Sequence, residues 1–249
     1  MERAKHLLIV ILLCAGFTSL KANYKSDIYV AYMRNNMKNW KTIIDQMDAV
    51  KIKSNEFRLE LVNYQYGYIA WCIGNKKKDE AEKYLNLAEK NIELLAGQKY
   101  NLSMVNAYKA AFYGFKIGLN SFLAPFVGGK SMDCAKLAMK LDDNNPLGHV
   151  QYANIEYYMP SIFGGSKTAA LAAYLKAKGL MEKNAVSIKD DWNYISLLTI
   201  IAKAYWDLKD LQTAKTYFEK IIQLAGGYEY EWVKKEMYPQ LMKEMSKKY

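Results

Sequence analysis

The sequence predicts an all-α protein: an antiparallel helix-pair solenoid of about ten helices that ends in a capping helix. Three observations lead to this fold class. Apolar residues recur three and four positions apart along nearly all of the 249 residues, which is the pattern of amphipathic helices. Strand-like alternation is nearly absent, and the chain has only four prolines. Stretches rich in Gly, Asn and Lys separate the periodic segments and mark turns.

The predicted helices follow one another with short connections. In chain order they span residues 26–49, 55–74, 78–96, 101–123, 130–142, 147–159, 166–183, 190–207, 210–225 and 229–247. The last one mixes Tyr228, Trp232 and Met237 with many charges, which suits a cap with a polar outer face. Pro239 should kink or divide this helix because proline removes a backbone donor.

One stretch shows the repeat most clearly, "YISLLTIIAKAYWDLKDLQTAKTYFEKIIQLAGG", residues 194–227. It resembles the tetratricopeptide repeat, a pair of antiparallel helices. Ala202 and Ala214 match the small positions where two helices cross closely, and Tyr205 and Phe218 match the aromatic positions. Ile221 stands where the family has a second small residue. Weaker copies occur at residues 66–95 and 145–180.

The opening "SDIYVAYMRNNMKNWKTIIDQM" and the Pro-to-GlyGly stretches look like those of exported tetratricopeptide-repeat-like proteins of Gram-negative bacteria. The Pro-to-GlyGly stretch is also similar to the periplasmic T-component proteins of TRAP-type uptake systems. These resemblances imply an exported helical-repeat protein that binds a partner. Neither of them supplies a catalytic residue.

Residues 1–22 have the features of a signal peptide, and residues 23–249 are expected to form a single helical-repeat domain. Arg3 and Lys5 precede an apolar run of eleven residues, Leu7 to Phe17. A membrane span needs about 20 such residues, so the run is typical of a cleaved leader. Cys14 leaves a lipoprotein as the alternative, although it follows Leu13 instead of a small residue. The expected location is outside the cytoplasm, in the periplasm.

The segment "APFVGGKS", Ala124 to Ser131, matches a loose phosphate-loop pattern. A phosphate loop needs a strand before it, whereas the preceding stretch has helical periodicity. A similar stretch at Pro160 repeats the Pro and the Gly pair but not the Lys-Ser order. We therefore expect a turn that is shared by two repeats, with no nucleotide site.

The residues that usually carry chemistry are sparse. Cys72 and Cys134 lie in apolar helical sequence and are expected to be buried free thiols, though an oxidising compartment would permit a bridge. His149, the only histidine after residue 22, has no ligand partners nearby. The formal net charge of +10 is spread along the chain. We expect no enzyme activity, no metal, no cofactor and no nucleic-acid partner.

The concave side of such a solenoid is formed by the first helix of each pair, and its unused side chains can contact a partner. The register of the repeat predicts six binding residues there: Tyr64, Tyr68, Trp71, Thr199, Lys203 and Trp206. An aromatic stripe of this kind can equally belong to the core. The leading hypothesis is a protein or peptide partner. The alternative is a small-molecule-binding accessory protein of a transport system.

Overall fold

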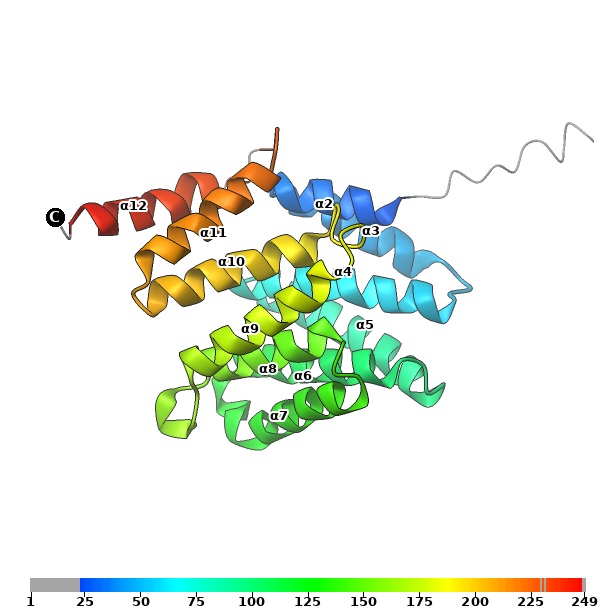
Figure 1. Cartoon of the computed structure of the whole chain (residues 1–249). Helices are drawn as coiled ribbons and strands as arrows, with labels where there is room; N and C mark the ends of the chain where they lie inside the picture. Colours follow the sequence, from blue (N-terminus) through cyan, green and yellow to red (C-terminus); the bar gives the residue numbers. More distant parts are fainter. Residues whose placement is uncertain (1–22, 229, 231, 248–249) are drawn as a thin grey trace, which may run out of the picture.

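A computed structural model describes residues 23–228, 230 and 232–247. These residues form eleven α-helices and no strand, which confirms the predicted all-α class (Figure 1). The helices are α2 (Tyr24–Met33), α3 (Met37–Ala49), α4 (Asn55–Gly74), α5 (Lys78–Gly97), α6 (Leu102–Leu119), α7 (Ala124–Leu141), α8 (Pro146–Tyr158), α9 (Lys167–Glu182), α10 (Trp192–Asp207), α11 (Leu211–Leu224) and α12 (Tyr238–Ser246). The predicted signal peptide lies outside the described residues.

Three shorter elements lie between or beside these helices. The 3₁₀ turn η1 (Ser121–Leu123) follows α6, and the 3₁₀ turn η2 (Ser161–Phe163) follows α8. A π-helical turn, η3 (Trp232–Met237), leads into α12. None of the described helices combines the length and the apolar character that crossing a bilayer requires.

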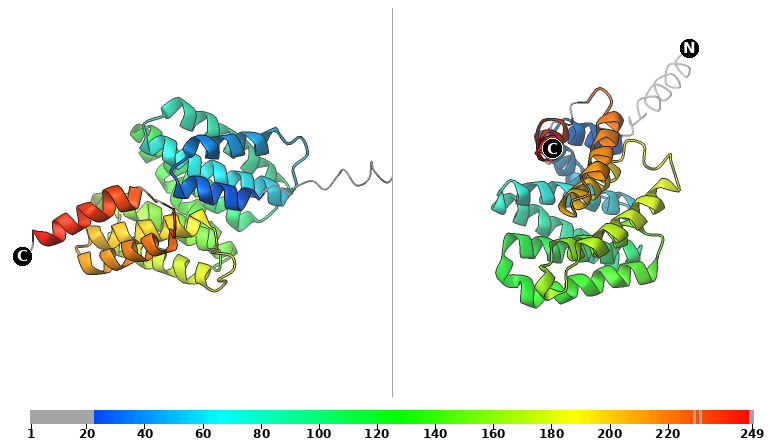
Figure 2. Two further views of the ribbon diagram at one scale, coloured as in Figure 1. Left: turned by 90° about the horizontal axis from the view of Figure 1, so that it is seen from above. Right: turned by 60° about the vertical axis from the view of Figure 1, so that its left-hand side comes forward.

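The helices pack as consecutive antiparallel pairs: α4 with α5, α6 with α7, α8 with α9, and α10 with α11. Each pair then packs on the next through α5 and α6, α7 and α8, and α9 and α10. Figure 2 shows the pairs stacked side by side from two further directions. This is the predicted helix-pair solenoid. The finer assignment to the tetratricopeptide class stays a prediction.

The crossing of α10 and α11 follows the repeat register. Ala202 and Ala214 are fully buried, and so are Phe218 and Ile221. Small side chains at a helix crossing let the two backbones approach closely. Ile221, the departure from the repeat pattern, is therefore accommodated as an ordinary core residue.

The predicted single helix over residues 26–49 is wrong, because the chain turns between α2 and α3. Asn35 has φ +51°, a left-handed conformation that Asn adopts more readily than most residues. The side chain of Asn36 then accepts a hydrogen bond from the backbone N–H of Asn39 and caps α3. The pair of asparagines thus both ends one helix and begins the next.

The two Pro-to-GlyGly stretches differ in structure, which corrects the expectation of a shared turn. Helix α7 begins at Ala124, not at residue 130, so Gly128 and Gly129 lie inside a helix. In the second stretch Gly164 has φ +97° and ends η2. A Cβ at the next residue, Gly165, would lie 1.9 Å from the carbonyl oxygen of Met159. The helical backbone of the first stretch cannot form the phosphate-binding loop that its letters suggest.

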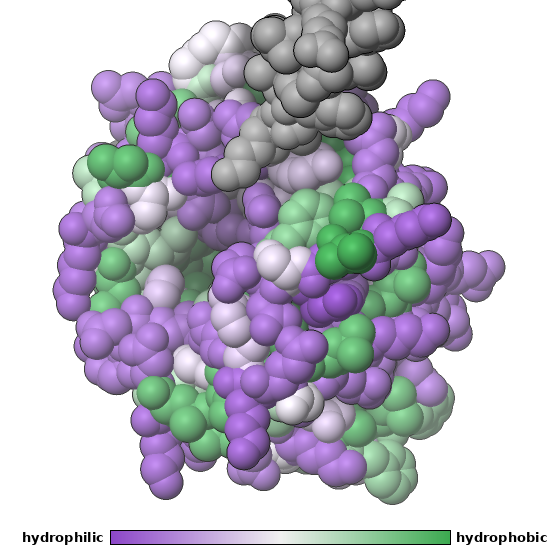
Figure 3. Space-filling model, turned by 90° about the vertical axis from the view of Figure 1, so that its right-hand side faces the viewer, coloured by the Kyte–Doolittle hydropathy of each residue, from purple (hydrophilic) through white to green (hydrophobic). Residues whose placement is uncertain are grey.

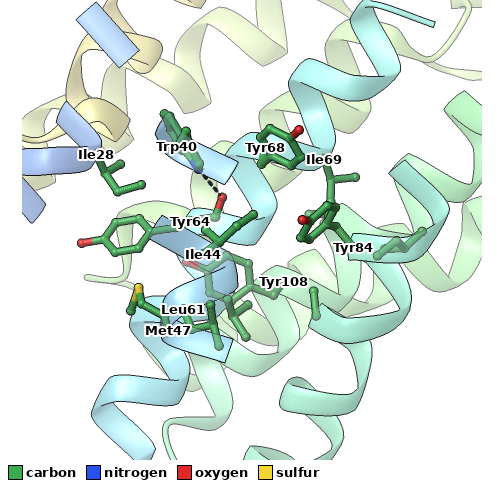
Figure 4. Packing of buried hydrophobic residues seen from close by; sticks show 14 of the residues in the cluster. Ile28, Trp40, Ile44, Met47, Leu61, Tyr64, Tyr68, Ile69, Tyr84 and Tyr108 are labelled. Atoms are coloured by element: carbon green, nitrogen blue, oxygen red, sulfur yellow. Dashed lines mark hydrogen bonds between the residues drawn. The ribbon is translucent and has the colours of Figure 1, made fainter. Parts of the chain in front are cut away.

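An aromatic junction joins the first helices of the chain to the last pair. Tyr32 of α2 packs against Trp40 of α3 and Trp192 of α10. The hydroxyl of Tyr230 donates a hydrogen bond of 2.7 Å to the hydroxyl of Tyr32. Helix α2 therefore lies against α10, and the array curves back on itself. In Figure 4 the indole N–H of Trp40 donates to the carbonyl oxygen of Tyr64, at 2.9 Å, within the same core.

The C-terminal helix covers the end of the last pair, as the predicted cap does. The indole N–H of Trp206 donates to the carboxylate of Glu244 in α12, at 2.7 Å. The π-helical turn changes to α-helix at Tyr238, immediately before Pro239, which lies in the first turn of α12. Proline is tolerated at that position because its missing N–H has no intrahelical partner there.

Candidate functional site

Tyr66 of α4 contacts the first helices of three other pairs. Its ring stacks on Phe115 of α6, with centroids 5.4 Å apart and planes at 20°. The ring also lies 6.2 Å from Trp192 of α10. Its hydroxyl accepts a hydrogen bond of 3.2 Å from the side-chain amide of Gln151 in α8. The faces of α4, α6, α8 and α10 that meet around Tyr66 are called here the inner face.

A chain of hydrogen bonds orients the polar groups of the inner face. The amide nitrogen of Asn154 donates to the amide oxygen of Gln151 at 3.1 Å. The hydroxyl of Tyr174, on α9, donates to the amide oxygen of Asn154 at 2.6 Å. Because Gln151 is buried and bonded on both sides, its rotamer and that of Tyr66 are held in place.

Tyr158 lies one helical turn beyond Asn154 and is 66% exposed. Burial by the surrounding protein raises the pKa of its phenol, and the nearby phenol of Tyr66 and carboxylate of Asp207 raise it further. Tyr66, Phe115 and Tyr158 are called here the aromatic triad.

Positive charge lies next to the triad at the end of α10. The carboxylate of Asp207 accepts hydrogen bonds from the hydroxyl of Tyr157 at 2.6 Å and from the ammonium of Lys167 at 2.8 Å. Burial opposes ionisation of Asp207, but these bonds and the charge of Lys203 outweigh it and hold its pKa below the usual value. Two ammonium groups, of Lys167 and Lys203, thus lie around one carboxylate.

The six residues predicted from the repeat register occupy different environments. Tyr64, Tyr68 and Thr199 are buried in the core. Their hydroxyls bond to Glu60, Glu80 and the carbonyl oxygen of Ile195 respectively. Burial leaves these three side chains little surface for a partner.

The other three predicted residues keep some exposed surface. Trp71 stacks on Tyr68 and lies under the ammonium of Lys77. The indole N–H of Trp206 donates a hydrogen bond to Glu244 of α12. Lys203 lies close to the carboxylate of Asp207. Lys203 is linked to the aromatic triad through Asp207, whose carboxylate it acts on and which in turn acts on Tyr158. A binding role for all six stays a prediction.

The aromatic triad itself was missed from the sequence. Tyr66 falls between the predicted Tyr64 and Tyr68, in the unit whose register is uncertain because its turn is longer. A signal was present in α8, where Leu147, Gln151, Asn154 and Tyr158 follow helical spacing along one face. Nothing in the sequence indicated that this face meets Tyr66.

The described residues contain no cluster of three His, Cys or carboxylate groups that could hold a metal ion. His149 is buried, with its Nε2 2.9 Å from the carbonyl oxygen of Asp143. Cys72 and Cys134 are free thiols, the first buried and the second half-buried. Burial raises the pKa of the Cys72 thiol to about 12, so it stays protonated and unreactive at neutral pH.

The surface is hollowed on one side when the molecule is viewed from the end that holds the connections α3–α4 and α9–α10 (Figure 3). Apolar side chains form the floor of this hollow, and hydrophilic residues surround it. The α9–α10 connection precedes α10, whereas Tyr158 and Asp207 are the last residues of α8 and α10, so this hollow faces the opposite end from them.

No protein-family model matches the chain, and no curated protein sequence matches it. Among solved structures, the chain is similar to the HusA haemophore from Porphyromonas gingivalis. The TM-score is 0.62 at 17% sequence identity, and the match covers 77% of this chain and 96% of the haemophore. At this identity the comparison shows that the two chains share a fold.

Proposed function

We propose that this chain is an exported, non-catalytic binding protein whose ligand is a flat, largely apolar molecule with acidic groups, such as haem or another porphyrin. The observation that carries the proposal is the aromatic triad beside Lys203 and Lys167. Stacked rings bind a flat apolar face, and ammonium groups bind carboxylates. The fold shared with a haemophore supports the same ligand class.

The proposed contacts are stacking and charge, without a histidine ligand to iron. The imidazole of His149 is buried and bonded to the loop at Asp143, so it is not presented to the inner face. Haem iron can also be held by Tyr, but burial raises the pKa of Tyr66 and of Tyr158, so both phenols stay protonated at neutral pH and are poor iron ligands. Haem and metal-free porphyrin should therefore bind with affinities of the same order.

The small-molecule alternative is thus favoured over a protein or peptide partner. A peptide groove would need a long accessible stripe, whereas the aromatic junction fills part of the space between α4 and α10. Trp192 packs there against Trp40, Tyr32 and Tyr66. What remains accessible is the region around Tyr158.

Titration of the protein with haemin, protoporphyrin IX and protoporphyrin dimethyl ester tests the proposal, with absorbance and tryptophan quenching as readouts. Tyr158→Ala should weaken binding of all three by about threefold to tenfold, the value of one aromatic contact. Tyr152→Ala, on the same helix but away from the aligned face, is the matched control. Absence of saturable binding by all three ligands would contradict the proposal.

The charge contribution can be separated from stacking. Lys203→Glu should weaken binding of the two free acids but leave the dimethyl ester nearly unaffected, because the ester has no carboxylates to repel. Lys136→Glu, on the exposed face of α7, is the control. Equal effects of Lys203→Glu on acid and ester would show that Lys203 does not contact the ligand's acidic groups.

A further inference from the structure

Two turns at one end of the array carry exposed apolar side chains. Helix α7 runs antiparallel to α6 and α8, so α6 and α8 point the same way and η1 and η2 lie at the same end (Figure 1). Four large side chains on and beside these turns are exposed by between 71% (Phe163) and 85% (Phe122). We call Phe122, Phe126, Ile162 and Phe163 the apolar tips.

Bare apolar side chains of this size are costly in water and mark a contact surface when several gather together. The backbone of both turns is held by hydrogen bonds. The backbone N–H of Phe163 bonds to the carbonyl oxygen of Pro160, and that of Leu123 bonds to the carbonyl oxygen of Asn120. The two turns are therefore ordered, and their backbone hydrogen bonds fix the positions from which the tips protrude.

Two segments that carry or flank the tips contain lysines but no acidic residue. Residues 117–132 and 157–181 contain no Asp or Glu. The same two segments contain four lysines, of which three form ion pairs with carboxylates outside the segments: Lys167 with Asp207, Lys176 with Asp143 and Lys178 with Glu182. Lys130 is exposed, one turn of α7 beyond Phe126, and takes part in none of the ion pairs found among the described residues.

We propose that the apolar tips dock this protein onto the surface of a bilayer that contains anionic lipids. Phe and Ile side chains would enter the boundary between headgroups and acyl chains, as the apolar face of an interfacial segment does. Lys130 would lie at the level of the phosphates, where its charge adds to the attraction.

The charge next to the apolar tips favours a lipid surface over a second copy of this chain as their partner. A second copy of this chain docked through the same face would bring two Lys130 side chains together, and neither segment contains a carboxylate to pair with them. Like charges placed opposite each other disfavour association. An anionic lipid surface provides the complementary charge and also an apolar layer that receives separate protruding side chains.

Vesicle co-sedimentation tests the proposal with the chain from Asn23 onward, which contains every described helix and omits the apolar leader. The vesicles are phosphatidylcholine alone, or phosphatidylcholine with about one-third phosphatidylglycerol as a source of surface charge. We expect binding to the anionic vesicles, and at least about fivefold weaker binding to the neutral ones or at high salt.

Two double variants decide whether the tips are responsible. Phe122→Ser with Phe163→Ser should lower binding to anionic vesicles by at least about tenfold, because the variant loses the two aromatic rings that would enter the bilayer. Ile52→Ser with Val186→Ser is the matched control: these side chains are 92% and 82% exposed and belong to the connections α3–α4 and α9–α10, away from η1 and η2. This pair should leave lipid binding unchanged.

Thermal melts of both double variants should match that of the parent chain, since all four side chains are exposed. The proposal is overturned if the anionic vesicles do not bind the parent chain, or if both pairs reduce binding equally. It is also overturned if the tip variant keeps full lipid binding but loses a dimer seen by analytical ultracentrifugation, because the tips would then bind a second copy.

Discussion

The indole rings of Trp40 and Trp192 pack edge to face directly over Gly67, with their centroids 5.0 Å apart and their planes at 75°. The first ring comes from α3 and the second from the start of α10, so the contact joins distant parts of the chain. A Cβ at Gly67 would lie 2.7 Å from an atom of each ring. Helix α4 thus needs a residue without a side chain at this crossing.

Gly67→Ala should destabilise the protein although Ala is the better helix former. Overpacking in a core costs about 1–3 kcal/mol, against a gain in helix propensity of about 1 kcal/mol. Two indoles held by neighbours cannot both move away. Gly114→Ala is the control, because nothing lies within 4 Å of the added Cβ. In thermal melts Gly114→Ala should raise the midpoint and Gly67→Ala should lower it; a rise for both would contradict the packing.

Ala214→Leu should lower stability by about 1–3 kcal/mol, because this fully buried residue lies at the crossing of α10 and α11. Gln212→Leu, exposed on the same helix, should change stability by less than about 0.5 kcal/mol. Denaturant unfolding of both variants provides the measurement. Small and equal changes would mean that the two helices do not approach closely there.

Asp191→Asn should stabilise the protein at neutral pH. Burial raises the pKa of the Asp191 carboxyl in the folded state, so its ionisation costs more there than in the unfolded chain. The destabilisation is therefore present above the folded pKa and disappears as pH falls below the ordinary value for Asp. Asn keeps the cap that Asp191 provides to the N–H of Asn193. Melting curves should differ at pH 7 and coincide in acid; a lower midpoint for the Asn variant at pH 7 would show that the negative charge is needed.

The native protein should begin at Asn23 after export. The reason is the short apolar run behind Arg3 and Lys5, with Ala22 before the cut. Cell fractionation followed by N-terminal sequencing measures both the location and the cleavage. An intact Met1 on cytoplasmic protein would contradict export, and a lipid-modified Cys14 at the N-terminus would support the lipoprotein alternative.

The helices and their pairing could be read from the sequence because they depend on local pattern. The predicted bounds 55–74 coincide with α4, and those of the last two pairs differ from the structure by one or two residues. Amphipathic spacing and turn residues act over one or two helical turns, so they are visible without knowing the partner helices. The Asn35–Asn36 turn was missed because the apolar spacing continues across it.

The sequence alone determined the fold class, the order of the helices and the small residues Ala202 and Ala214 at their crossing. Tertiary structure decided which faces remain accessible. Tyr64 and Tyr68 pack into the core while Tyr66, between them, joins four helices, and only the curvature of the array brings Tyr158 near it. Side chains two positions apart on a helix point in different directions, and what each meets depends on helices far along the chain.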